Sequence, residues 1–472
     1  MNQHLISRYS TAFRNLRDYT VISTERNERR NLFKQANSVS LIVVSFMKRS
    51  TTSMRFVIVC LLAATMITCA ATAGDELIAS PEAGWPQWRG PRRDGISHEK
   101  GLLGSWPQGG PELLWKVDGL GKGWSSPIVV GERLYITGDV GDDLIVFALD
   151  RSGKEQWRTE SGRAWKGSFP GARACCAFSE GRVYNMNAHG RVACIDADSG
   201  DEVWAVNILE RFEGKNITWA LSECLLVDGQ RVIVTPGGAG ALMAALDKRN
   251  GQTVWTTDPL DDDSTSHCSP ILFQYGGRRV IANCSSAHGF GVDADTGKLL
   301  WTVPLKNEFG ANISTPIYDS GRIFYVTPYG EHGRAYRLIA DGQGIAAEHL
   351  WTNMSLDTVT GAGVLVDGVL FSAGYKKFKW WFGVDWQTGR TKYELKDFTT
   401  GAAIWADGRL YCLDESGEVG LLKIGADGLE IVGRFGLVSK RVGDAWAHPV
   451  LLDGRLYLRY HDTLFCYDVK KP

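Results

Sequence analysis

One eleven-residue pattern recurs along the chain and limits what the chain can fold into. "GVDADTGKLLW" (291–301) is matched almost letter for letter by "CIDADSGDEVW" (194–204), and more loosely by "ALDKRNGQTVW" (245–255). Each copy places an Asp-x-x-x-Gly turn a few residues before a tryptophan. A pattern repeated at a steady interval predicts a fold built from equal units that pack on one another.

The aromatic residues that end the units give the length of the repeat. They are Trp115, Trp157, Trp204, Trp255, Trp301, Trp351, Tyr393 and Phe435, so seven intervals span 320 residues, about 46 each. Upstream of most lies a strand–turn–strand pattern with glycine at the bend, as in "WSSPIVVGERLYI" (124–136). Four short strands in 40–50 residues predict a β-propeller blade, whereas all-β solenoid repeats are usually shorter.

Counting these units predicts an all-β, eight-bladed propeller of four-stranded blades. The inner strands are expected to begin near Trp124, Ala172, Trp219, His267, Ile313, Thr360, Thr400 and Trp446. The last unit ends at "FCYDVKKP" and lacks room for a fourth strand, while "ELLWKV" (112–117) resembles an outer strand without a blade. Pairing the two would close the ring and remove both free sheet edges.

The N-terminal region divides into three segments. Residues 54–73 predict a signal peptide, with basic residues, an apolar stretch and a small-x-small cleavage site before Gly74. The apolar stretch is short for a membrane anchor, and a lipoprotein with Cys69 at its start is left open. The basic extension 1–53 then precedes the natural start at Met54. Residues 74–111 are expected to form an irregular lead-in to the propeller (112–472), which is exported to the periplasm or secreted without a membrane span.

The mature chain is acidic, although the whole chain has a net charge of only −1. Residues 1–73 hold ten Lys/Arg and three Asp/Glu, so the remainder holds 42 Lys/Arg against 50 Asp/Glu. An acidic surface argues against nucleic acid as a partner. We expect a monomer whose partner is an unknown protein or small ligand.

The repeat resembles the tryptophan-docking motif of pyrroloquinoline-quinone (PQQ) repeat propellers. The resemblance covers about 112–472, is strong in four blades and is weak in blades 5–7, while "WPQWRGPRRDGIS" (85–97) resembles the lead-in of exported bacterial members. It implies a structural docking role for Trp115, Trp157, Trp204, Trp255, Trp301 and Trp351. The family includes dehydrogenases that bind PQQ and calcium, and proteins similar to the outer-membrane assembly lipoprotein that bind no cofactor, so the fold alone cannot choose a function.

The residues expected around the propeller axis must make that choice. At the starts of the inner strands they are Trp124, Arg173, Trp219, Glu223, His267, Asn312, Trp446 and His448. Such a set favours a polar, aromatic ligand-binding funnel. Quinone chemistry would need calcium ligands, for which Glu223 and Asn312 are candidates, and a base, for which only Asp444 is available. We therefore expect a non-catalytic binding scaffold without cofactor or metal; the alternative is a PQQ- and calcium-dependent alcohol or sugar dehydrogenase.

Two cysteine pairs are candidates for disulfides. Cys175 and Cys176 are adjacent, and the resemblance implies a vicinal disulfide of the kind that covers PQQ in alcohol-oxidising members. Adjacent side chains of a strand point to opposite faces, which favours two separate thiols. Cys268 and Cys284 fall near the start of one strand and the end of its antiparallel neighbour, so they could face each other.

Overall fold

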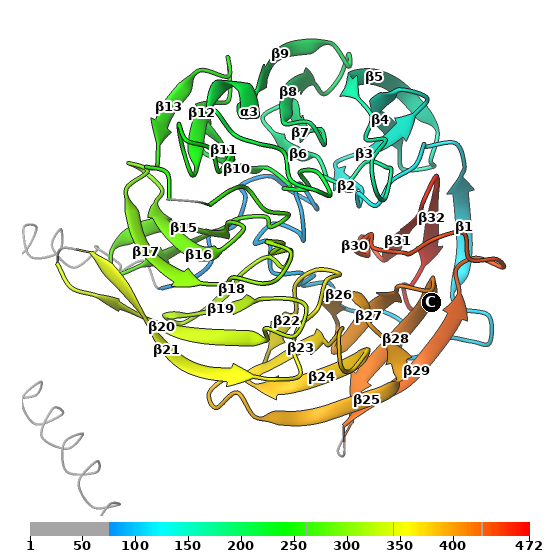
Figure 1. Ribbon diagram of the computed structural model, residues 1–472. Helices are drawn as coiled ribbons and strands as arrows, with labels where there is room; N and C mark the ends of the chain where they lie inside the picture. Colours follow the sequence, from blue (N-terminus) through cyan, green and yellow to red (C-terminus); the bar gives the residue numbers. More distant parts are fainter. Residues whose placement is uncertain (1–74, 261–262, 343, 426–427) are drawn as a thin grey trace, which may run out of the picture. The chain divides into compact units, whose positions relative to one another are not determined.

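The strands are arranged as eight four-stranded antiparallel sheets around a central axis (Figure 1). The structure is a computed structural model that describes residues 75–260, 263–342, 344–425 and 428–472. The predicted basic extension (1–53) and signal peptide (54–73) lie outside the described residues. The predicted eight-bladed, all-β propeller is confirmed.

The first four blades follow one another along the chain. Blade 1 consists of β2 (Ile128–Val130), β3 (Arg133–Val140), β4 (Asp143–Asp150) and β5 (Glu155–Arg163). Blade 2 consists of β6 (Ala177–Ser179), β7 (Arg182–Met186), β8 (Arg191–Asp196) and β9 (Glu202–Asn207), followed by the short helix α3 (Ile208–Arg211). Blade 3 consists of β10 (Leu226–Asp228), β11 (Arg231–Val234), β12 (Ala244–Asp247) and β13 (Thr253–Thr256). Blade 4 consists of β14 (Ile271–Tyr275), β15 (Arg278–Cys284), β16 (His288–Asp293) and β17 (Leu299–Pro304).

The next three blades repeat the same order. Blade 5 consists of β18 (Ile317–Asp319), β19 (Arg322–Val326), β20 (Gly333–Ala340) and β21 (Ile345–Asn353). Blade 6 consists of β22 (Val364–Val366), β23 (Val369–Ala373), β24 (Trp380–Asp385) and β25 (Thr391–Thr399). Blade 7 consists of β26 (Gly401–Ala406), β27 (Arg409–Asp414), β28 (Glu418–Ile424) and β29 (Leu429–Gly436).

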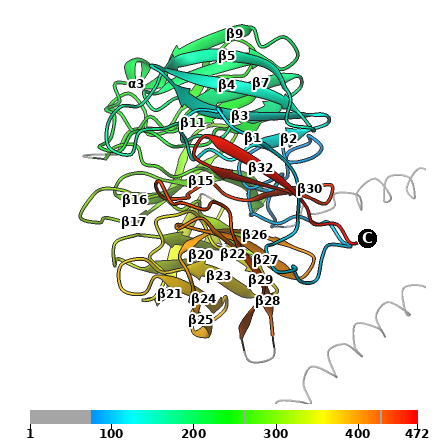
Figure 2. The ribbon, with the colours of Figure 1, turned by 90° about the vertical axis from the view of Figure 1, so that its right-hand side faces the viewer.

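The eighth blade joins the two ends of the propeller. It consists of β30 (Val450–Leu452), β31 (Arg455–Tyr460), β32 (Thr463–Asp468) and, from the other end of the chain, β1 (Glu112–Val117). β1 and β32 run antiparallel, with Glu112 opposite Asp468 and Val117 opposite Leu464, and lie side by side in Figure 2. The predicted closure of the ring by an N-terminal strand is therefore confirmed.

The aromatic residue that ends a unit packs where the backbone leaves room for it. Trp301 lies opposite Gly291 across β16 and β17, and the indole passes so close that a side chain at Gly291 would overlap it. Trp255 reaches the following blade, where its indole N–H donates to the Ala294 carbonyl (3.1 Å). A methyl group at the turn residue Gly297 would come within 2.5 Å of that ring. These contacts explain why glycine occupies both positions of the repeat, since any side chain there would overlap an indole. That the tryptophans stabilise the ring stays a prediction.

The lead-in segment forms no long strand, yet residues 77–103 contact every blade. Short backbone bridges link Leu77 to β14, Trp85 to β2 and Ile96 to β26. Side chains reach two further blades, because Trp88 donates to Thr315 of blade 5 (3.0 Å) and Arg89 donates to Gly363 of blade 6 (2.7 Å). From blade 1 to blade 8 the residues contacted include Val129, Phe178, Leu225, Phe273, Thr315, Gly363, Trp405 and Val469. We call this segment the plug, since it crosses the axis.

Candidate functional site

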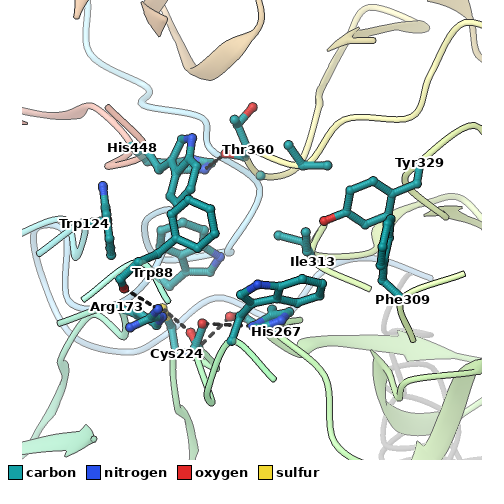
Figure 3. Close-up of a pocket in the computed structure, with 17 residues that line it drawn as sticks. Trp88, Trp124, Arg173, Cys224, His267, Phe309, Ile313, Tyr329, Thr360 and His448 are labelled. Carbon is teal, nitrogen blue, oxygen red and sulfur yellow. Dashed lines mark hydrogen bonds between the residues drawn. The ribbon is translucent and has the colours of Figure 1, made fainter. Parts of the chain in front are cut away.

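A pocket of about 300 Å³ lies at the axis, and we call it the funnel (Figure 3). The plug contributes Trp88 to its lining, the turn between β19 and β20 contributes Tyr329, and the other residues come from the loops that lead from one blade to the inner strand of the next. The lining consists of Trp88, Trp124, Phe169, Arg173, Trp219, Ser222, Cys224, His267, Ser269, Phe309, Ile313, Tyr329, Val359, Thr360, Gly361, Trp446 and His448. Seven of these seventeen side chains are Trp, Phe or Tyr, so the funnel offers flat apolar walls.

The aromatic side chains contact one another and form two continuous walls. Trp446 packs against Trp124, with ring centroids 5.1 Å apart, and against Phe169 at 5.3 Å. In the other wall, Phe309 meets Trp219 at 5.8 Å and Tyr329 at 4.6 Å in edge-to-face geometry. Rings held against other rings keep their orientation, which favours a preformed site for a flat ligand.

Arg173 is the cation in this pocket. Its guanidinium lies over the ring of Trp124 (5.5 Å) and that of Trp165 (5.8 Å), and it donates to the carbonyls of Phe169 and Gly171. Burial lowers the pKa of Arg173 to about 10, against the opposing effect of Asp139. The side chain therefore keeps its positive charge at neutral pH.

The two histidines of the funnel are held neutral. Burial, with Arg173 nearby, lowers the pKa of His267 to about 4, and its Nδ1 lies 3.1 Å from the Ser222 hydroxyl. Burial also lowers the pKa of His448, which donates from Nε2 to the Thr360 carbonyl (3.1 Å). His448 packs on Trp88 with ring centroids 4.3 Å apart. Hydrogen bonds rather than charge therefore fix these imidazoles.

Six of the eight residues predicted for the axis meet in the funnel, and two do not. Trp124, Arg173, Trp219, His267, Trp446 and His448 line it. The carboxylate of Glu223 is fully buried and accepts from the Thr235 backbone N–H (2.9 Å) and hydroxyl (2.7 Å). Asn312 is also fully buried, and it donates to the Ser285 carbonyl (2.8 Å). Both side chains use their polar atoms in hydrogen bonds to neighbouring loops, because a buried polar group without a partner is costly.

The candidate base is also outside the funnel lining. The carboxylate of Asp444 pairs with Arg441, while its backbone carbonyl accepts from the Trp124 indole (2.9 Å). Among the described residues that line the funnel there is no carboxylate. Calcium needs several clustered oxygen ligands, and no group of three or more potential metal-binding His, Cys, Asp or Glu side chains occurs in the described part of the chain.

All eight cysteines of the described residues are buried free thiols. Cys175 faces Cys224 of the next blade, whereas Cys176 packs in the core with Ile128 and Tyr135, so the two thiols point to different surroundings and the vicinal disulfide of the alternative stays a prediction. The cause is the alternation of side chains along an extended segment. Cys268 and Cys284 do contact each other by a side-chain hydrogen bond, and their oxidation to a disulfide stays a prediction.

Sequence reasoning missed Trp88, Ser222, Cys224, Ser269, Phe309 and Tyr329. Cys224 carries a detectable signal, because it follows Cys175 by 49 residues and so occupies the equivalent place in the next unit. Ser269 extends that series into the following blade. Trp88 carries no such signal, since the plug precedes the repeats and has no counterpart in any blade.

The family of the chain follows from comparison with known proteins. A family model described as "Outer membrane protein assembly factor BamB" matches residues 141–428. That match covers more than half of the chain, which belongs to this family of PQQ-repeat β-propellers.

Curated relatives match a smaller part of the chain. The quinohemoprotein alcohol dehydrogenase ADH IIB of Pseudomonas putida is 29% identical over 147 residues, 28% of this chain and 21% of the relative. The 1-butanol dehydrogenase (quinone) of Thauera butanivorans is 28% identical over 158 residues, 30% of this chain and 25% of the relative. These matches span a quarter or less of the relatives' own length.

Solved structures of a BamB protein and of a quinohemoprotein alcohol dehydrogenase both share the fold of this chain. BamB from Moraxella catarrhalis has a TM-score of 0.56 and 15% identity, covering 76% of this chain and 99% of that one. The quinohemoprotein alcohol dehydrogenase from Comamonas testosteroni has a TM-score of 0.54 and 14% identity, covering 82% of this chain and 81% of that one. At such identities the likeness concerns the fold alone. In the described residues, no helix has the length and apolar character needed to cross a membrane.

Proposed function

We propose that this chain is an exported, non-catalytic propeller that binds a small ligand in its funnel, and that the ligand combines a flat apolar ring system with an acidic group. The observation that carries the proposal is the make-up of the funnel lining, which has seven aromatic side chains, one half-buried cation and no carboxylate among the described residues. Aromatic walls favour a flat ligand, and the charge of Arg173 favours an anionic group.

The size and shape of the funnel indicate that its ligand is small. Trp88 and His448 pack together at the axis, and the plug holds both, since Arg89 lies 3.5 Å from His448 Nδ1. A pocket of about 300 Å³ is at the lower end of the range for small-molecule sites. A protein partner would reach it only with a protruding side chain, and an acidic chain of this kind is not expected to bind nucleic acid.

The alternative, a PQQ- and calcium-dependent dehydrogenase, lacks the donors that its chemistry requires. Glu223 and Asn312 bond to protein groups away from the funnel, and Asp444 pairs with Arg441. The side chains present therefore do not fit a calcium-bound quinone with a carboxylate base. We propose that the chain needs neither PQQ nor calcium and acts as a monomer. Export is supported by the family description, which names an outer-membrane assembly factor.

Calorimetric titration of the full chain tests this proposal. The probes are 2-naphthoate and PQQ, each added with calcium and with a chelator. Dye reduction is then assayed with 1-butanol as the electron donor. We expect saturable binding of 2-naphthoate, the same PQQ affinity with calcium and with chelator, and no dye reduction. Calcium-dependent PQQ binding with dye reduction that disappears in Arg173→Ala and Asp444→Asn would establish the dehydrogenase instead.

A further inference from the structure

Two cysteines on neighbouring blades lie one behind the other, and only one of them reaches the funnel. Cys175 precedes β6 and Cys224 precedes β10, so they occupy equivalent places in blades 2 and 3. The backbone N–H of Cys175 donates to the Cys224 sulfur (3.2 Å), just as the N–H of Ser126 donates to the Cys175 sulfur (3.1 Å). Cys224 lines the funnel and Cys175 does not. A reagent in the funnel therefore meets Cys224 first.

Figure 3 places Cys224 on the same side of the funnel as Arg173 and His267. Its backbone N–H donates to the Ser269 hydroxyl (3.0 Å), which fixes the residue against blade 4. The thiol of Cys175 is in hydrogen-bond contact with the sulfur of Cys224. The two sulfur atoms are thus neighbours on adjacent blades, so a bond between them would join groups that already touch.

The positive charge beside this pair comes from the plug. Arg93 is 2% exposed and donates to the carbonyls of Cys224 (2.7 Å) and Leu225 (3.0 Å). Its strongest charge interactions with acidic groups are with Cys224 and then Glu223. A buried guanidinium is costly without a negative partner, and a thiolate on Cys224 supplies one.

The local groups also separate the roles of the two thiols. Burial opposes ionisation of Cys224, but hydrogen bonds from the thiol and the N–H of Cys175, together with Arg93, outweigh it and lower the pKa of Cys224. Burial and the neighbouring sulfur raise the pKa of Cys175 well above the usual thiol value. Cys224 is therefore the nucleophile, because the thiolate is the reactive form, and Cys175 keeps the proton.

We propose that Cys224 and Cys175 form a dithiol that reacts with low-molecular-weight disulfides entering the funnel. The Cys224 thiolate attacks one sulfur of the disulfide, the S–S bond breaks, and one thiolate leaves. Cys175 then loses its proton and attacks the Cys224 sulfur, which displaces the second thiolate and forms a Cys175–Cys224 bond. The protein loses two electrons, the small disulfide is reduced to two thiols, and their protons come from Cys175 and from water. This chemistry goes beyond ligand binding and does not depend on it.

Mass spectrometry of the reduced, folded full chain tests the proposal. With oxidised glutathione we expect a peptide that links Cys175 to Cys224, and with iodoacetamide we expect Cys224 to be labelled at least about tenfold faster than the buried Cys412. Cys175→Ser should stop at one glutathione on Cys224, Cys224→Ser should leave Cys175 unmodified, and the control Cys412→Ser should behave as wild type.

Labelling of the wild type needs no variant, so its result does not depend on whether a variant folds. Equal labelling rates for Cys224 and Cys412 would overturn it. A bond between Cys175 and Cys176 in place of the bond to Cys224 would also overturn it, because the adjacent pair would then be the reactive one.

Discussion

The rim and the axis of this propeller are built on different rules. At the rim, an aromatic residue, a small residue opposite it and a turn glycine recur from blade to blade, as Trp255 and Gly297 illustrate. Around the axis, equivalent places hold different side chains: Ser126, Cys175, Cys224 and Ser269 occupy them in four successive blades. Repetition at the rim serves the packing of neighbouring blades, whereas the axis presents a different set of side chains to the funnel from each blade. The difference teaches that function in a repeat fold is to be sought where the repeat is broken.

The largest effect is expected at the rim. Trp301 is 5% exposed and packs in the core with Phe273 and Tyr325. Replacing it by alanine leaves a cavity between blades and should lower the free energy of unfolding by about 3–5 kcal/mol, measured by denaturant titration. The control Trp301→Phe should keep most of the stability, because a ring still fills the space. An alanine variant as stable as wild type would show that the rim aromatic is not structural.

The sequence could predict the rim almost completely. Regular spacing revealed eight blades, and the incomplete units at 112–117 and 446–472 revealed how the ring closes, because a propeller cannot leave two edges unpaired. The axis was only partly predictable: an inner-strand start near the axis does not determine whether its side chain points into the funnel. Trp124 and Trp446 point into it, whereas Glu223 and Asn312 turn toward loops that need their hydrogen bonds.

The plug could not be predicted at all as part of the site. Trp88, Arg89 and Arg93 reach the axis through contacts with residues more than 130 positions away, such as Leu225 and Thr315. No local pattern encodes such partners. Positive φ angles at Arg89 (60°) and Arg93 (59°) show that the path is set by tertiary contacts rather than by local preference.

A smaller effect is expected at Glu223, whose hydrogen bonds near the axis are structural. Its titration should change the free energy of unfolding with pH. Burial raises its pKa to about 7, although hydrogen bonds from Thr235 and the charge of Arg93 act in the opposite direction. Between pH 4.5 and 7, the folded state keeps a proton that the unfolded state has released, so the free energy of unfolding falls as pH rises. The loss is on the order of 3 kcal/mol.

Glu223→Gln removes this titration and provides the test. The stability of wild type relative to the variant should decrease by that amount between pH 4.5 and 8 in denaturant titrations. The control Glu210→Gln changes an exposed residue of α3 and should keep the dependence of stability on pH that Glu223 gives the wild type. A constant difference for Glu223→Gln would mean that the buried carboxyl ionises as it does in the unfolded chain.

The most direct measurement compares one tryptophan of the axis with one of the rim in a calorimetric titration of the full chain with 2-naphthoate. Trp446→Ala removes the ring that packs against Trp124 and Phe169, so affinity should fall about tenfold or more, which corresponds to about 1.4 kcal/mol, while the melting temperature stays close to wild type. Trp301→Ala should show the reverse, with a much lower melting temperature and unchanged affinity of the folded protein. Loss of binding in Trp301→Ala with full binding in Trp446→Ala, or no binding to the wild type, would contradict the assignment of ligand binding to the funnel.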